Sequence, residues 1–161
     1  MNTPVSRLTA ANNYFEDFAV GDVFQHARGR TITETDNVGI TLQVLNTAQG
    51  HFNEHRMLGS AFGQRINFGG ITASFIIGLA AQDTAEQVLE ERGLNRIRFS
   101  NPVFHGDTLT AFTEVLRKED GARDGAGLVT FRHVGINQDR KVVFTGERHV
   151  LMKRRSHWGE R

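Results

Sequence analysis

The apolar run from Ile71 to Ala81 limits most strongly what this chain can fold into. Its residues are hydrophobic or small on nearly every side of a helix, so the helix that they predict must be covered all round. A curved β-sheet is the simplest structure that wraps a single helix in a chain of this length. The run is also too short to span a bilayer, which takes about 20 residues. We expect a helix from Ile71 to Arg92, followed by Gly93 as its stop.

The segments around this helix predict β-strands. Before it, residues 23–32 alternate in polarity, and Thr33 has the features of an N-cap for a short helix that ends near Asn46. After it come four alternating segments separated by turn residues, with residues 119–127 as a loop. These segments are residues 94–99, 108–118, 128–137 and 141–153. The order indicates an α+β fold in which an antiparallel β-sheet wraps around one long central helix.

Composition sets the domain organisation and excludes several classes of function. With 161 residues the chain suits one domain, which we place at residues 14–153, after a loose N-terminal segment (1–13) and before a basic C-terminal tail (154–161) that we expect to fray. The 19 basic and 18 acidic residues give a net charge of +1, so we expect no nucleic acid partner. Because there is no cysteine, disulfides, thiol nucleophiles and cysteine-ligated zinc are excluded. We also expect no metal site, since the histidines are scattered over strands.

The N-terminal residues predict where the protein works. They contain no apolar segment of the kind that a secretory signal requires. Together with the short apolar run, this predicts a cytoplasmic protein without a membrane partner.

The stretch from Leu45 to Gly70 is the candidate active site. It brings polar residues, among them Asn46 and His51, to a Gly69-Gly70 pair that opens the central helix. Backbone N–H groups at a helix N-terminus lack partners inside the helix and are suited to hold a carbonyl oxygen. Histidine can exchange a proton near neutral pH. This combination indicates carbonyl or thioester chemistry.

Three motifs resemble the MaoC-like hydratases, a family with the hotdog fold. The first is Tyr-Phe-Glu-Asp-Phe-Ala-Val-Gly-Asp at residues 14–22, which is similar to the opening of that family. The second, residues 46–54, resembles its hydratase motif, in which an acidic residue precedes the catalytic histidine by five positions. The third, residues 98–109, resembles the family's strand entry Arg-Phe-x-x-Pro-Val-x-x-Gly-Asp-Thr-Leu. The resemblance covers residues 14–152 and implies a single hotdog domain.

The second motif departs from the common pattern of the family. Asn46 stands where the acidic residue is usual, and Phe68-Gly69 stands where the family has His-Gly at the helix start. An Asn at the first position is closer to the branch that resembles mesaconyl-CoA (methylmalyl-CoA) hydratases. An amide cannot act as a base, so His51 would handle more of the proton transfer than in an Asp/His pair. Glu54 is the alternative source of a carboxylate.

The resemblance implies a hydro-lyase that adds water reversibly to a 2-enoyl-CoA. The acyl group would be short-chain, branched or dicarboxylic, and no cofactor would be needed because coenzyme A is part of the substrate. His51 would be the acid/base, Asn46 the water-orienting group, and the N–H of Gly69 or Gly70 the oxyanion donor. The implied substrate-binding residues are Phe68, Gly70, Asn53, Arg96 and Arg98, the two arginines near the coenzyme A phosphates. We expect a homodimer with the sheets joined edge to edge, or a trimer of dimers.

Two other functions compete with the hydratase. A hotdog acyl-CoA thioesterase would need a carboxylate over the thioester carbonyl, and release of free coenzyme A would reveal it. A non-catalytic acyl-CoA-binding subunit is favoured by the replacement of acids with Asn46 and Asn53. Tight binding of an acyl-CoA without turnover would identify that function.

Overall fold

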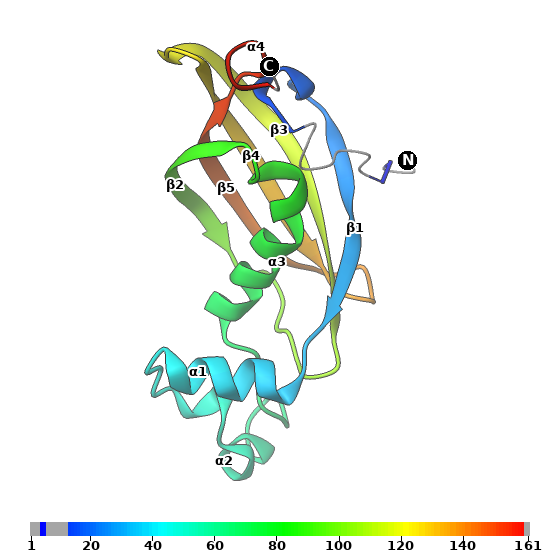
Figure 1. Ribbon diagram of the computed structural model, residues 1–161. Coiled ribbons are helices and arrows are strands. Elements are labelled where there is room, and N and C mark those ends of the chain that lie inside the picture. Colours follow the sequence, from blue (N-terminus) through cyan, green and yellow to red (C-terminus); the bar gives the residue numbers. More distant parts are fainter. Residues whose placement is uncertain (1–3, 6–12, 160–161) are drawn as a thin grey trace.

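The computed structural model describes residues 4–5 and 13–159. Its five-stranded antiparallel sheet has the order β1-β3-β4-β5-β2 and curves around helix α3, which confirms the predicted α+β hotdog architecture (Figure 1). The strands are β1 (Val23–Thr31), β2 (Val88–Arg98), β3 (Thr108–Arg123), β4 (Ala126–Ile136) and β5 (Val142–Lys153). The helices are η2 (Phe15–Asp17), η3 (Thr35–Gly39), α1 (Ile40–Gln43), η4 (Gln49–His51), α2 (Glu54–Leu58), α3 (Gly69–Thr84) and α4 (Arg155–Trp158).

Helix α3 packs its apolar residues into the concave face of the sheet. Ile76 and Ala80 are completely buried, and Ile76 belongs to a core cluster with Leu109 of β3 and Phe144 of β5. The sequence prediction that this helix is wrapped by strands is therefore confirmed. None of the helices in the described part of the chain is long and apolar enough to cross a membrane.

The predicted length of the central helix was wrong. The helix ends at Thr84, and residues from Val88 onward form β2, which pairs with β5. The spacing of Val88 and its polar neighbours also suits a helix, but the segment instead pairs with β5 along one edge, where the backbone of both strands gains hydrogen-bond partners. Val88 packs on the apolar core, and Glu91 forms an ion pair with Arg148 of β5. Gly93 therefore lies inside a strand and does not end the helix.

The β3–β4 hairpin is longer than its sequence predicted. We expected a loop over residues 119–127, but β3 continues to Arg123 and β4 begins at Ala126. The short turn is completed by Gly125, whose φ of +70° is one that glycine adopts without strain. At the start of the helices that follow β1, Thr33 Oγ1 accepts the Asp36 N–H at 3.1 Å, as expected of a capping side chain, although the N-cap position of η3 is Glu34.

The two ends of the described chain meet at one end of the sheet. The tail was expected to fray, but the Arg155 N–H donates to Glu16 and the Trp158 indole N–H donates to the Gly125 carbonyl. The tail is therefore packed against η2 and the β3–β4 turn. Most of the predicted loose segment 1–13 lies outside the described residues, and Asn13, its last residue, is fully buried.

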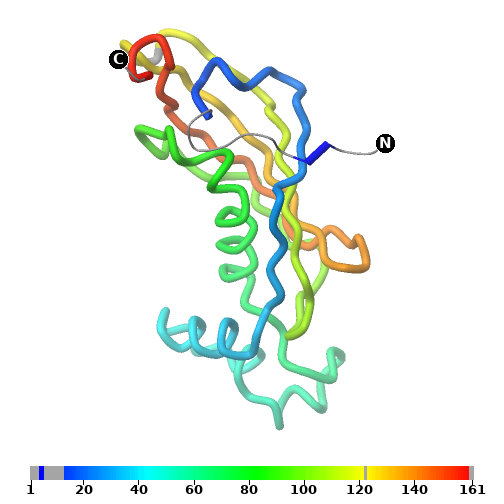
Figure 2. Tube along the Cα trace, turned by 45° about the vertical axis from the view of Figure 1, so that its right-hand side comes forward, coloured from blue at the N-terminus to red at the C-terminus, as the bar shows by residue number. Residues whose placement is uncertain are grey.

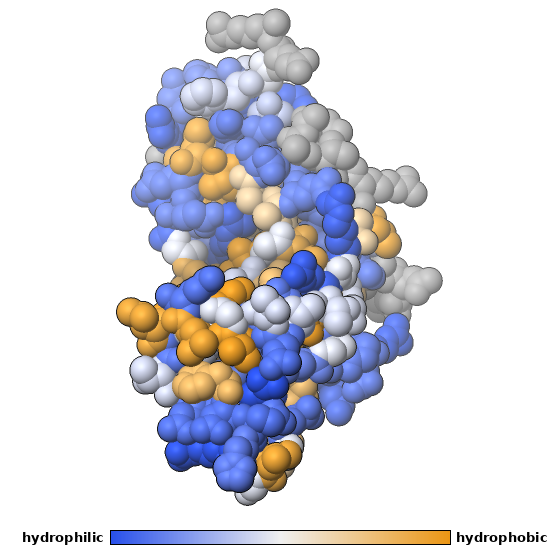
Figure 3. Space-filling view, turned by 60° about the horizontal axis from the view of Figure 1, so that its bottom comes forward, coloured by the Kyte–Doolittle hydropathy of each residue, from blue (hydrophilic) through white to orange (hydrophobic). Residues whose placement is uncertain are grey.

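The segment between β1 and α3 extends beyond the other end of the sheet. Residues 33–68, which we call the overhanging segment, contain α1 and α2 and lie below the first turn of α3 (Figure 2). Apolar side chains gather on this end of the molecule (Figure 3), where Leu42, Val44 and Leu45 are exposed. The segment forms one wall of the candidate site.

A chain of buried polar side chains joins the end of α3 to the sheet. His26 Nδ1 lies 2.5 Å from the Asp83 carboxylate, its Nε2 lies 2.7 Å from Thr113 Oγ1, and that oxygen lies 2.8 Å from His133 Nδ1. Burial lowers the pKa of His133 to about 3, and the charges of Arg148 and His26 act in the same direction. Burial also lowers the pKa of His26, although Asp83 opposes it. Both rings are therefore neutral in the folded protein at pH 7.

The buried network of His26, Asp83, Thr113 and His133 predicts that the protein loses stability in mild acid. Because both histidines bind a proton more readily in the unfolded chain, their contribution is complete above pH 6.5 and falls as the pH drops toward 3. One such group changes the free energy of unfolding by up to about 1.4 kcal/mol per pH unit. Urea unfolding at pH 7.5 and 5.0 should show a smaller difference for His133→Phe than for the wild type. His55→Gln, at an exposed position, should not reduce the difference; an undiminished difference in His133→Phe would contradict this account.

Candidate active site

Two pockets lie at the start of α3, one lined by Asn67 and Gly69 and the other by Phe68 and Gly70. The first, which we call the His51 pocket, has a volume of about 380 Å³ and is lined by residues that include His51, Asn67 and Gly69. The second, the Asn46 pocket, has a volume of about 430 Å³ and is lined by Asn46, Gly70 and mainly apolar residues of α1 and α3. The structure therefore brings His51 and Gly69 together, as predicted, and places Asn46 in the neighbouring pocket.

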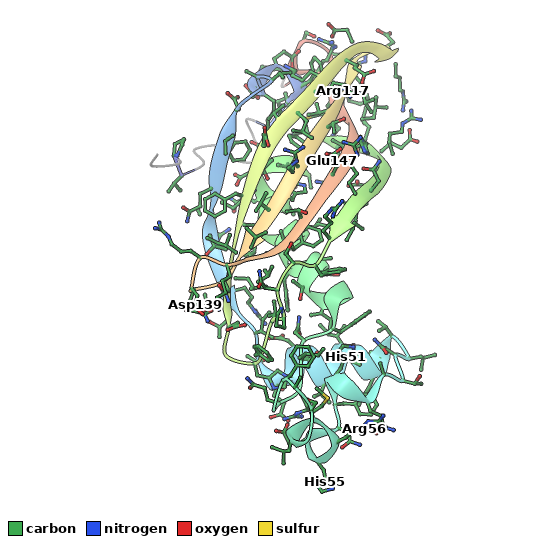
Figure 4. All side chains as sticks on the ribbon, turned by 180° about the vertical axis from the view of Figure 1, so that it is seen from behind. His51, His55, Arg56, Arg117, Asp139 and Glu147 are labelled. Atoms are coloured by element: carbon green, nitrogen blue, oxygen red, sulfur yellow. The ribbon has the colours of Figure 1, made fainter. Side chains whose placement is uncertain are left out.

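His51 is held in one orientation by the backbone. It ends the short helix η4, its Nδ1 lies 3.0 Å from the Ile66 carbonyl, and its ring packs on Phe68 with the ring centroids 5.4 Å apart. A carbonyl oxygen can only accept, so Nδ1 carries the proton and Nε2 has a free lone pair in the neutral ring. Figure 4 shows His51 at the junction of the overhanging segment and the sheet. His51 can therefore accept a proton through Nε2.

The start of α3 presents backbone donors without protein acceptors. The helix has no side-chain cap, and among the described residues the N–H groups of Gly69 and Gly70 have no hydrogen-bond partner. Aromatic rings pack directly on both glycines: a Cβ at Gly69 would lie 3.2 Å from the Phe99 ring, and one at Gly70 would lie 2.7 Å from the Phe68 ring. The absence of side chains therefore lets these rings close over the helix start while its donors stay available.

Asn37, which the sequence did not single out, connects the parts of the site. It is completely buried in η3, a π-helical turn, and its Nδ2 lies 3.0 Å from the His51 carbonyl and 3.1 Å from the Ile66 carbonyl. Its Oδ1 accepts the Phe68 N–H at 3.0 Å. One amide therefore fixes both the segment that carries His51 and the N-cap residue of α3. No sequence signal separates such an amide from an ordinary helix-surface asparagine.

His105 completes the network behind the site. Its Nε2 lies 2.9 Å from Asn37 Nδ2, and burial, aided by the positive charge of Arg65, lowers the pKa of His105. The two N–H bonds of Asn37 Nδ2 face three acceptors, so the neutral ring can share one of the amide protons with a backbone carbonyl. Arg65 forms ion pairs with Glu34 and Glu54, so Glu54 is bound to an arginine on the surface of the overhanging segment.

Asn46 is positioned by the end of α1. Its N–H bonds to the Thr41 carbonyl and the Leu45 N–H bonds to the Leu42 carbonyl, which is the Schellman arrangement, with Leu45 at φ +57° where glycine is usual. The Asn46 Oδ1 accepts the Ala48 N–H at 2.9 Å. The acceptor of the amide is therefore used by the backbone, and its Nδ2 is the group offered to the Asn46 pocket.

The remaining predicted binding residues lie in different environments. Asn53 caps α2, accepting the Arg56 N–H at 3.0 Å, and donates to Gln49 at 2.7 Å. Arg96 lies on the outer face of the sheet, 3.2 Å from Glu147, a residue that Figure 4 places far from His51. Arg98 is exposed and directly precedes Phe99, which lines the His51 pocket. A contact of either arginine with coenzyme A stays a prediction.

Comparison with known proteins decides the family. A family model described as mesaconyl-CoA hydratase matches residues 4–154. The chain belongs to this family. The match covers the whole sheet, α3 and the overhanging segment, so the MaoC-like resemblance of the three motifs is confirmed.

Named relatives and solved structures agree with this membership of the mesaconyl-CoA hydratase family. A mesaconyl-CoA hydratase from Haloarcula marismortui is 35% identical over 94% of this chain and 45% of the relative, and a beta-methylmalyl-CoA dehydratase from Chloroflexus aurantiacus is 37% identical over 91% and 46%. The structure of a MaoC domain dehydratase from Chloroflexus aurantiacus superposes with a TM-score of 0.83 at 31% identity, covering 89% of this chain and 45% of that one. The chain spans about half the length of these relatives.

The role of Asn37 predicts the result of changing its amide. Asn37→Asp keeps the shape but places a carboxylate oxygen against the two backbone carbonyls that Nδ2 now contacts. We expect the free energy of unfolding to fall by about 3 kcal/mol, because buried acceptors would face one another. Urea denaturation measures this change. Asn101→Asp is the control, because Asn101 is exposed and its Nδ2 donates one hydrogen bond; an equal loss in both variants would contradict the proposed role of Asn37.

Proposed function

We propose that the chain hydrates and dehydrates a 2-enoyl-CoA thioester in the His51 pocket, without a further cofactor. The observation that supports this most strongly is the pairing of a free helix N–H at Gly69 with the free Nε2 of His51 in one pocket. Hydration of an enoyl thioester needs a donor for the carbonyl oxygen and a base for water. The family and the named relatives support the same reaction.

The reaction uses His51 first as a base and then as an acid. The Gly69 N–H holds the thioester oxygen, Nε2 of His51 takes a proton from water, and the remaining hydroxide oxygen bonds to the β-carbon. The electron pair of the double bond moves to the α-carbon and carbonyl, so negative charge develops on the oxygen at the helix start. The protonated His51 then delivers its proton to the α-carbon, and the ring returns to its neutral form.

A short acyl group fits the space beside the helix start. The Asn46 pocket is apolar except for Asn46 and Ser74, and it begins at Gly70, the residue next to the proposed oxyanion donor. We propose that it receives the acyl substituent, with the Asn46 Nδ2 directed to a carbonyl or carboxylate oxygen of a branched or dicarboxylic chain. The names of the mesaconyl-CoA and methylmalyl-CoA relatives support this class of substrate.

The lining of the His51 pocket favours hydration over thioester hydrolysis. A hotdog thioesterase would need a carboxylate beside the thioester carbonyl, and none of the described residues that line this pocket is acidic. The acyl-binding alternative rests on Asn46, which lines the neighbouring pocket, and on Asn53, which caps α2. Because Asn46 and His51 line different pockets, the absence of a carboxylate at position 46 does not remove the proposed acid/base, His51.

We propose that the chain forms a dimer through β2. This strand is last in the sheet order, pairs with β5 along one edge, and exposes Leu94 and Ile97, and the exposed Phe99 directly follows it. Pairing two such edges would cover unpaired backbone groups and apolar side chains at once. The other edge strand, β1, is partly covered by Val5, which pairs with Gln25.

Replacement of His51 tests the proposed reaction. In His51→Gln the acid/base group is lost while an amide can still contact the Ile66 carbonyl, so turnover should fall at least about 10²-fold with the fold intact. The decrease of enoyl-thioester absorbance gives the rate, and circular dichroism checks the fold. His55→Gln is the matched control, because His55 is an exposed residue of α2 (Figure 4). Near wild-type turnover in His51→Gln would rule out His51 as the acid/base.

The proposed dimer predicts a molar mass of about 36 kDa, twice the 18.0 kDa of the chain. Leu94→Lys places a charge on the exposed edge and should weaken the dimer, because the charge must be desolvated on association. Light scattering after size-exclusion chromatography gives the molar mass, and its dependence on protein concentration shows how far Leu94→Lys weakens the dimer. A wild type that stays at the mass of one chain would contradict the edge-to-edge arrangement.

A further inference from the structure

Asn67 has a polar atom that the fold leaves without a partner. This residue lies between Ile66, whose carbonyl accepts the hydrogen bond from His51 Nδ1, and Phe68, the N-cap residue of α3. Its side chain is 6% exposed, and the residue lines the His51 pocket with Gly69. Within the described residues its Oδ1 has no hydrogen-bond donor. Leaving a buried acceptor without a donor destabilises the folded state, so this oxygen calls for a ligand.

The orientation of the amide follows from its other contacts. Nδ2 lies 2.8 Å from Thr72 Oγ1 and 3.3 Å from the Phe68 carbonyl. The carbonyl oxygen can only accept, so the nitrogen is the end that faces it. The end left over is therefore an acceptor, fixed by the first turn of α3.

The polar groups that line the His51 pocket include two acceptors and one donor without protein partners among the described residues. The acceptors are the Nε2 of His51 and the Oδ1 of Asn67, and the donor is the Gly69 N–H. A water molecule has two protons to donate, which matches the two acceptors, and its oxygen lone pair is then free for the β-carbon. The Gly69 donor is left for the thioester oxygen.

We propose that Asn67 binds the reacting water together with His51. The water gives one hydrogen bond to Asn67 Oδ1 and its other proton to His51 Nε2, while its oxygen bonds to the β-carbon. Asn67 keeps its own protons throughout and acts as an oriented acceptor. This assigns to Asn67 the water-orienting role that the motif predicted for Asn46, which lies in the other pocket. The inference rests on the proposed hydratase function.

Two substitutions separate the acceptor from the shape of the residue. Asn67→Leu removes both polar ends at similar volume, so kcat should fall about 10²-fold with KM changed less than about threefold. The free energy of unfolding of Asn67→Leu in urea should not fall to the extent that kcat falls, because the substitution also removes the unpartnered acceptor.

Asn67→Asp keeps an acceptor. Its kcat should be at least tenfold higher than that of Asn67→Leu, and a tenfold difference in rate corresponds to about 1.4 kcal/mol in the activation free energy. Its added charge favours the protonated ring of His51, so the acidic fall in kcat should move to higher pH.

The outcomes separate this inference from the proposed function. A wild type that hydrates no 2-enoyl-CoA overturns both. An active wild type with unchanged kcat in Asn67→Leu, or with a raised KM and unchanged kcat, overturns the role of Asn67 and leaves the hydratase function standing. If Asn67→Leu does not fold, Asn67→Asp decides, and an unmoved pH profile there overturns the inference.

Discussion

The site depends on one buried amide. Asn37 donates to the carbonyls of His51 and Ile66 and accepts from the N–H of Phe68, so a single side chain ties the overhanging segment to the first turn of α3. The sheet holds that helix by a buried core, and the helix start is where the donors for an oxyanion lie. The neutral His105 behind Asn37 takes part in the same network. Fold stability and catalytic geometry are therefore coupled through this asparagine.

Aromatic packing divides the helix start into two compartments. Phe68 lies against Gly70 and His51, while Phe99 lies against Gly69, and neither contact leaves space for a Cβ on the glycine. One side holds His51 and Gly69, the proposed acid/base and oxyanion donor, and the other is mainly apolar with the amide of Asn46. A 2-enoyl thioester at the first turn of α3 would thus keep its carbonyl and its reacting double bond in the first compartment and present the rest of its acyl group to the second. This division explains how the chain can lack an acidic residue at position 46 and still offer the groups that hydration requires.

The sequence predicted those features that depend on local pattern, and it missed those that depend on distant partners. The apolar surface of residues 71–81 required a wrapping sheet, and the His51 and Gly69 positions followed from motif spacing. The end of the helix was misassigned because the pattern of residues 85–92 suits a helix or a strand. Pairing with β5, which lies more than fifty residues later in the sequence, makes this segment a strand. Asn37 and Asn67 could not be identified from the sequence, because the role of an amide depends on hydrogen-bond partners that come close to it only in the folded chain.

The most direct measurement offers the protein mesaconyl-CoA and crotonyl-CoA and follows both the enoyl absorbance and the free thiol. Addition of water across the double bond removes the absorbance and leaves the thioester bond intact. The account predicts that the absorbance of at least one substrate falls to an equilibrium value while no coenzyme A is released. Release of thiol at the same rate as the spectral change, or tight binding of both compounds with no spectral change, would contradict it.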